Sequence, residues 1–138
     1  MSRASHKKVG LDTSFVLRLL MGEPPAQASL AVARMNALRF SGKQAVVSDL
    51  VVCETYFALH HHYEVPKQLA LDKLKEFLES PEIAPTGEAL AILQEAGLGK
   101  AKPGFVDRLI HVHYLREASC MLTFEKAAAK LPQVIVPK

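Results

Sequence analysis

The sequence lacks tryptophan, has only two cysteines and contains no long uninterrupted run of apolar residues. A membrane-spanning helix needs about 18 successive apolar residues, so none is expected. The basic, polar segment at residues 1–8 is not followed by the apolar stretch of a signal peptide. No Gly-x-x-x-x-Gly-Lys-Ser/Thr loop for phosphate binding occurs either. These absences predict a cytoplasmic protein with no membrane contact.

The two cysteines, Cys53 and Cys120, each lie in an apolar segment and share no short Cys-x-x-Cys spacing. They are therefore predicted to be buried free thiols and not metal ligands. The net charge of +3 tolerates an anionic partner such as nucleic acid without requiring one.

The chain has 138 residues, of which 49% are hydrophobic, enough for one domain with a sizeable core. We expect a single domain over residues 1–138, with residues 1–6 as a flexible basic tail. Segments with strand patterns alternate with segments of helical periodicity, which predicts an α/β fold with a parallel sheet covered by helices on both faces. The expected strands are residues 7–11, 44–47, 82–84, 119–123 and 134–136.

Three further expectations concern packing. The helix from Asp49 to about Tyr63 is apolar nearly all round, so it should be buried on more than one side. Thr86 is predicted to cap the helix that follows the third strand. Phe40, Tyr56 and Tyr63 are expected in the core.

Four acidic residues stand where elements begin or end. Asp12 and Glu125 each follow a buried strand, Glu54 lies one turn into the helix after the second strand, and Asp107 begins the helix before the fourth strand. Each has a plain alternative: the helix dipole favours Asp107 and Glu125, and Glu54 can reach solvent or pair with an arginine. If the first and fourth strands are neighbours, however, all four carboxylates converge. Oxygen-only ligands of this kind suit Mg²⁺ or Mn²⁺.

The run His60-His61-His62 suggests a metal cluster at first sight. Successive helix positions point about 100° apart, so the three imidazoles are not expected to converge on one ion. Only His61 shares the helix face of Glu54, and helix-end polar residues are the simpler interpretation.

The ordered set of acidic motifs resembles the PIN-domain family, and the VapC-type toxins in particular. The matching segments are residues 10–14 (GLDTS), 48–54 (SDLVVCE), 105–110 (FVDRLI) and 122–125 (LTFE). The family usually has Asp where this chain has Glu125, which affects the position of a second metal. Arg108 also differs from the small residues common after the third acid of the family.

The resemblance implies a three-layer α/β/α fold with a five-stranded parallel sheet in the order 3-2-1-4-5. It implies a Mg²⁺- or Mn²⁺-dependent endoribonuclease that hydrolyses RNA phosphodiester bonds, as the toxin of a VapBC-type pair with an antitoxin partner and a tendency to form homodimers. Carried over by position, Asp12, Glu54, Asp107 and Glu125 would be the catalytic metal ligands. Ser14 and Thr123 would support the site from beside it.

Three alternatives remain open at this point. A non-catalytic PIN-like module could bind RNA or a protein with the same fold. A phosphatase of the haloacid dehalogenase type could use Asp12 as a nucleophile, but it usually has a second Asp two residues later, where this chain has Ser14. A purely structural α/β domain would use all four acids as caps or surface charges.

Overall fold

The computed structural model of the chain describes residues 7–138, and the predicted tail at residues 1–6 lies outside the described residues. The chain divides into two compact units, Met1–Leu90 and Ala91–Lys138, called unit 1 and unit 2 below. The expectation of one domain over residues 1–138 stays a prediction.

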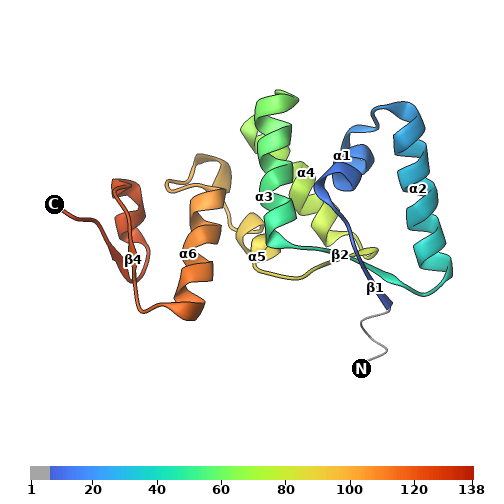
Figure 1. Cartoon of the computed structure of the whole chain (residues 1–138). Coiled ribbons are helices and arrows are strands. Elements are labelled where there is room, and N and C mark those ends of the chain that lie inside the picture. Colours follow the sequence, from blue (N-terminus) through green and yellow to red (C-terminus); the bar gives the residue numbers. More distant parts are fainter. Residues whose placement is uncertain (1–6) are drawn as a thin grey trace. The chain divides into compact units, whose positions relative to one another are not determined.

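Unit 1 contains a parallel sheet of three short strands in the order β1-β2-β3 (Figure 1). The strands are β1 (Lys8–Gly10), β2 (Gln44–Val47) and β3 (Ile83–Pro85). In the central register, Ala45 of β2 pairs with Val9 on one side and with Ile83 on the other. Because all three strands run in the same direction, their carboxyl ends meet at one edge of the sheet. The three strands predicted from the sequence are thus confirmed, with β1 shorter than expected.

The helices of unit 1 begin and end where local signals place them. α1 ends at Gly22, whose φ of 70° lies in the left-handed region that glycine adopts without a Cβ penalty. α2 has Pro25 as its first residue, where the missing N–H would have no partner within the helix. The helices are α1 (Thr13–Met21), α2 (Pro25–Phe40), α3 (Asp49–Phe57), a π-helix (Ala58–His62) and α4 (Lys67–Glu79).

The core of unit 1 is aliphatic. α2 packs on β2, α4 packs on β3, and α1 contacts both α2 and α3. The fully buried side chains come from the sheet and from α1, α3, the π-helix and α4: Val16, Val47, Val52, Leu59, Leu74 and Leu78. This packing fixes the positions of the helices around the carboxyl edge of the sheet.

α3 packs against two helices, α1 and α4, which confirms the expectation of burial on more than one side. Val52, Thr55 and Tyr56 are buried, whereas Leu50 and Phe57 are 79% and 46% exposed. One stripe of the helix, which points away from both neighbours, therefore stays in solvent. The expectation for Phe40 was wrong, because this side chain at the end of α2 is 88% exposed.

The short helix α5 (Ala89–Leu93) is capped differently from the prediction. Its first N–H groups are bound by the buried carboxylate of Asp49, which accepts from Glu88 N (2.9 Å) and Ala89 N (3.0 Å). Thr86 instead continues the strand pairing, since its N–H donates to Val47 O (3.0 Å). The predicted cap at Thr86 is therefore wrong. The side chain of Asp49, about forty positions earlier in the chain, caps α5 instead.

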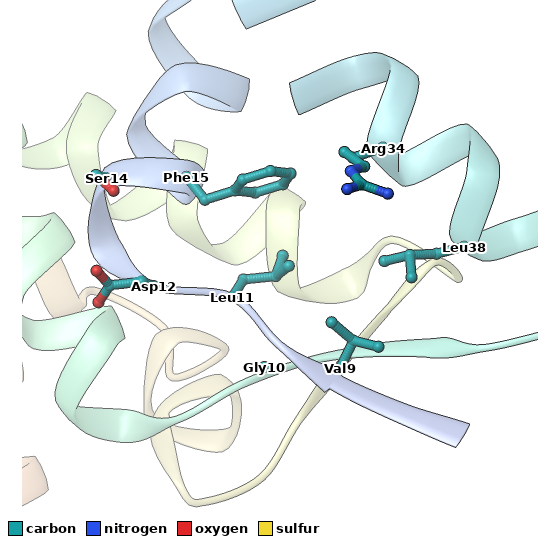
Figure 2. A pocket seen from close by; sticks show the side chains of 8 residues that line it. All are labelled: Val9, Gly10, Leu11, Asp12, Ser14, Phe15, Arg34 and Leu38. Carbon is teal, nitrogen blue, oxygen red and sulfur yellow. The ribbon is translucent and has the colours of Figure 1, made fainter. Parts of the chain in front are cut away.

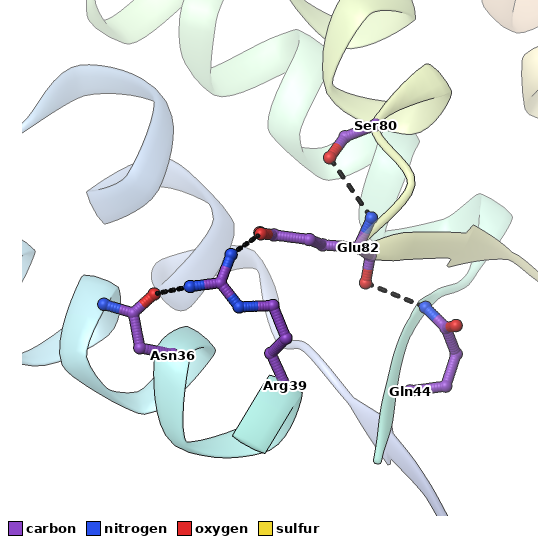
Figure 3. Close-up of polar contacts among 5 residues, drawn as sticks. All are labelled: Asn36, Arg39, Gln44, Ser80 and Glu82. Carbon is purple, nitrogen blue, oxygen red and sulfur yellow. Dashed lines mark hydrogen bonds and ion pairs between the residues drawn. The ribbon is translucent and has the colours of Figure 1, made fainter. Parts of the chain in front are cut away.

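Polar contacts join the opposite edge of the sheet, where β2 and β3 begin. Arg39 at the end of α2 donates to Glu82 (3.0 Å) and to Asn36 (3.1 Å), and the Gln44 side chain donates to Glu82 O (2.8 Å) (Figure 3). Ser80 Oγ accepts from Glu82 N (3.4 Å). Both ionic partners are well exposed, so the ion pair adds little stability by itself. The contacts do fix the start of β3 against α2.

Unit 2 contains one long helix and a two-stranded parallel sheet. α6 (Phe105–Glu117) begins after Gly104, and β4 (Met121–Leu122) pairs with β5 (Val134–Ile135). The buried side chains of this unit include Phe105, Leu109 and Ala128. Two short 3-10 helices complete it, at Leu98–Lys100 and Lys126–Lys130.

The α/β class and the parallel pairing are confirmed. The described residues form a three-stranded sheet with β2 in the middle and a separate pair β4-β5. These are the two parts, 3-2-1 and 4-5, of the predicted order, whereas one five-stranded sheet stays a prediction. Within residues 7–138, no helix has both the length and the hydropathy needed to cross a bilayer.

Candidate active site

Asp12 stands directly after β1, at the carboxyl edge of the sheet. Backbone pairing continues to Leu11, whose N–H donates to Val46 O (3.0 Å). Asp12 is the N-cap residue of α1, with φ −83° and ψ 165°, yet its side chain makes no capping hydrogen bond. The carboxylate is solvent-exposed. An aspartate at this position usually accepts a hydrogen bond from the first turn of the helix, so its carboxylate is available for another ligand.

Glu54 is connected to this junction through Thr13. The Thr13 hydroxyl, next to Asp12 in the chain, donates to Glu54 Oε1 at 2.6 Å. Glu54 is exposed on α3, as in the alternative in which its carboxylate reaches solvent. α1 and α3 are in contact, and this packing brings the first and second predicted acids to the same edge of unit 1.

Sequence reasoning missed Thr13 and chose Ser14 as the supporting hydroxyl. The available signal was a hydroxyl residue in the first helical position after the strand. Ser14 is exposed and lines a cavity with Asp12. Its supporting role stays a prediction.

The cavity beside Asp12 has a volume of about 410 Å³. Its walls are mostly apolar, from Val9 and Leu11 of the first strand region, Phe15 of α1 and Leu38 of α2. Figure 2 shows the Asp12 carboxylate and the Arg34 guanidinium on different sides of it. The cavity continues the carboxyl edge of the sheet toward α2.

The other two predicted acids belong to unit 2. Asp107 lies in the first turn of α6, as predicted. Glu125 is the N-cap residue of the 3-10 helix Lys126–Lys130 and, like Asp12, makes no side-chain cap. Thr123 Oγ1 accepts a hydrogen bond from Glu125 N (3.0 Å), so this threonine fixes the backbone that carries Glu125. Both acids are exposed, and the convergence of all four carboxylates stays a prediction.

The donor atoms in unit 1 suit a hard divalent cation. Asp12 and Glu54 offer carboxylate oxygens, and both side chains are open to solvent. Mg²⁺ is commonly held by one or two carboxylates with several waters. No group of three His, Cys, Asp or Glu side chains placed to hold a metal occurs in the part of the chain that the structure describes. The pair in unit 1 therefore suits a magnesium or manganese ion that keeps several waters.

The three consecutive histidines have separate contacts, and two of their rings also meet. His60 Nδ1 lies 3.0 Å from Val65 O. The His61 ring stacks on Phe57, with centroids 5.9 Å apart, and His62 meets Tyr63 edge-on at 5.2 Å. The His60 and His61 rings meet edge to face, with centroids 4.7 Å apart. That the three imidazoles do not converge on one ion stays a prediction.

Of the two cysteines, Cys53 lies in surroundings that disfavour the nucleophilic thiolate. Cys53 and Cys120 are free, as predicted, but half-buried and not fully buried. Burial raises the pKa of the Cys53 thiol, and the nearby Asp49 carboxylate raises it further. A raised pKa keeps the thiol protonated, and the thiolate is the reactive form. The carboxylates of Asp12 and Glu54 are thus better candidates for metal binding or catalysis in unit 1 than the Cys53 thiol.

Comparison with known proteins gives one family. The sequence matches the PIN domain over residues 9–133. Neither the comparison with curated proteins nor that with solved structures gave a match. PIN domains are generally nucleases, often from toxin–antitoxin systems, and typically use divalent metal ions. Since the match covers nearly the whole chain, this protein belongs to the PIN domain family.

Proposed function

We propose that this chain is a Mg²⁺- or Mn²⁺-dependent endoribonuclease, the toxin of a VapBC-type toxin–antitoxin pair. The observation that carries the proposal is the Asp12 carboxylate, which occupies an N-cap position without capping the helix. A structural aspartate would use its oxygens on the helix N–H groups. Here they stay open at the carboxyl edge of a parallel sheet, where ligands bind in α/β folds.

The proposed roles follow from position. Asp12 and Glu54 hold the metal from unit 1, and Thr13 orients Glu54 by its 2.6 Å hydrogen bond to Oε1. The family resemblance assigns the same role, direct or through water, to Asp107 and Glu125. When bound, the metal would lower the pKa of a coordinated water and stabilise negative charge on a phosphate. Glu125 stands in place of the Asp usual in the family. Its longer side chain would carry the carboxylate farther from the backbone than an Asp side chain does.

Purified protein is incubated with a mixed pool of RNA in Mn²⁺ and in EDTA. Wild type is compared with Asp12→Asn and with the control Asp72→Asn, an exposed aspartate of α4 that bonds Gln68. We expect cleavage by wild type and control in Mn²⁺ only. Asp12→Asn should be at least about 100-fold slower, because a charged ligand of the metal is lost.

Cleavage that survives Asp12→Asn would exclude the proposed site. RNA binding by wild type without any metal-dependent cleavage would instead assign the chain to the non-catalytic binding modules. Inhibition of the cleavage by a purified candidate antitoxin would test that partner separately.

A further inference from the structure

One face of α3 and the following π-helix is exposed along its length and carries both a carboxylate and aromatic rings. Leu50, Glu54, Phe57 and His61 follow each other at spacings of four, three and four, which places them on one side of a helix. All four are exposed. Glu54 is the proposed metal ligand, so this face starts at the proposed active site.

Phe57 and His61 form a flat stack on this face. Their ring centroids lie 5.9 Å apart and their planes differ by 21°. The neighbouring pair, Tyr56 and His60, stacks in a similar way at 6.1 Å and 12°, but Tyr56 is buried. Only the Phe57–His61 stack therefore combines a planar arrangement with wide access from solvent.

The turn that carries His61 is a π-helix. A π turn has more residues per turn than an α-helix, so it changes the direction of the side chains that follow it, and such turns recur at functional sites. Tyr63, just beyond it, lines a shallow cavity of about 470 Å³ together with Arg18 of α1.

We propose that Phe57 and His61 form a stacking platform for unpaired bases of the RNA substrate, which it holds beside the scissile bond. The inference rests on the proposed function and names residues that bind the substrate of that site. By the rise of an α-helix, Phe57 lies about 4.5 Å and His61 about 10 Å along the axis from Glu54. A strand lying along α3 would meet the platform within a few nucleotides of the metal.

The chemistry of the face favours RNA over a protein. Proteins recognise single-stranded RNA by stacking bases on phenylalanine, tyrosine, tryptophan and histidine, and such stacking tolerates any base sequence. A carboxylate in the middle of the face and an imidazole at its end would be unpaired if an apolar protein surface covered them. Bases and water leave both groups solvated.

The test uses a short single-stranded RNA with a fluorescent 2-aminopurine, whose emission falls when the base stacks. Binding is measured in EDTA, so that no cleavage occurs, with full-length wild type, Phe57→Leu and His61→Ala. The controls are Phe40→Leu, which removes an exposed ring at the end of α2, and His62→Ala, which removes the neighbouring imidazole. Thermal unfolding of each variant verifies folding.

We expect Phe57→Leu and His61→Ala each to raise the Kd about 5- to 30-fold and to abolish the quenching. The controls should stay within about twofold of wild type. In Mn²⁺, the two platform variants should raise KM more than they lower kcat, since they weaken binding and leave the metal ligands in place. An abasic nucleotide at the stacked position should remove the difference between wild type and Phe57→Leu.

Unchanged binding and quenching in both platform variants, with metal-dependent cleavage by wild type intact, would overturn the platform alone. Absence of both RNA binding and cleavage in wild type would overturn the proposed function, and the platform with it. If Phe57→Leu leaves RNA binding unchanged and alters the sedimentation coefficient instead, the face is a protein–protein contact.

Discussion

The junctions β1–α1 and β2–α3 have nearly the same backbone and use their side chains for different purposes. Asp12 at the first has φ −83° and ψ 165°, and Ser48 at the second has φ −83° and ψ 160°. The Ser48 hydroxyl accepts a hydrogen bond from Val51 N (3.3 Å) and caps its helix. Asp12 makes no such bond. The same local geometry thus serves folding at one junction and leaves a ligand available at the other.

The difference continues one residue further along each chain segment. Asp49, after Ser48, is buried and binds the backbone N–H groups of Glu88 and Ala89. Thr13, after Asp12, points its hydroxyl to the exposed Glu54. The β2–α3 junction therefore stabilises unit 1, whereas the β1–α1 junction organises carboxylates. An acid at a strand end is functional or structural according to its partners, not its place.

The largest effect is expected from converting the first junction into the second with Asp12→Ser. The serine can cap α1 as Ser48 caps α3, so the free energy of unfolding should stay within about 0.5 kcal/mol of wild type or rise. RNA cleavage should fall at least about 100-fold, because the metal loses a charged ligand. Urea unfolding and a cleavage assay in Mn²⁺ measure the two quantities. If Asp12→Ser lowered the free energy of unfolding enough to explain the lost cleavage by unfolding alone, Asp12 would be a structural cap.

Asp49→Ala should have the largest effect on stability. Two backbone N–H groups would lose their acceptor next to the core, and an unsatisfied buried donor costs about 1–3 kcal/mol. We expect unfolding in urea at a lower midpoint, with a loss of about 3 kcal/mol. Asp12→Asn is the control, with a change within about 0.5 kcal/mol.

Gly87 provides an independent check of this contact. A Cβ at this position would overlap the Asp49 carboxyl group, so Gly87→Ala should also destabilise unit 1. If both changes act through the same contact, the double variant should lose less than the sum of the two single losses. Additive losses would contradict a shared origin.

The smallest effect is expected from Ser48→Ala. Loss of one half-buried helix cap costs about 1 kcal/mol, and cleavage should remain within about twofold of wild type. Chemical denaturation and the same cleavage assay compare it with Ser48→Asp, which keeps an oxygen in the capping position. A large loss of cleavage in Ser48→Ala would mean that the second junction also takes part in the site.

The sequence predicted elements whose signals are local. β2 (Gln44–Val47) has the predicted bounds, and Asp107 lies in the first turn of α6, as predicted. The cap and the length of α5 were not predictable, because they depend on Asp49, which is 40 positions from Ala89. Local pattern carries no information about such a contact.

The candidate site, like the fold, could be predicted only where its signals are local. The position of Asp12 after a strand follows from the alternation of apolar residues and a helix start. The bond between Thr13 and Glu54 joins residues 41 positions apart and depends on how α1 packs against α3. The exposure of Glu54 could only be left open as an alternative, since an apolar composition does not say which side of a helix its neighbours leave uncovered.

The contacts of Arg39, Glu82, Gln44 and Ser80 lie where β2 and β3 begin, at the edge opposite Asp12 (Figures 2 and 3). Substitutions at that edge are therefore expected to leave the positions of the Asp12 and Glu54 carboxylates unchanged. Sequence variation that leaves the proposed chemistry unchanged would be tolerated at the amino edge of the sheet. Selection on chemistry would act on the carboxyl edge.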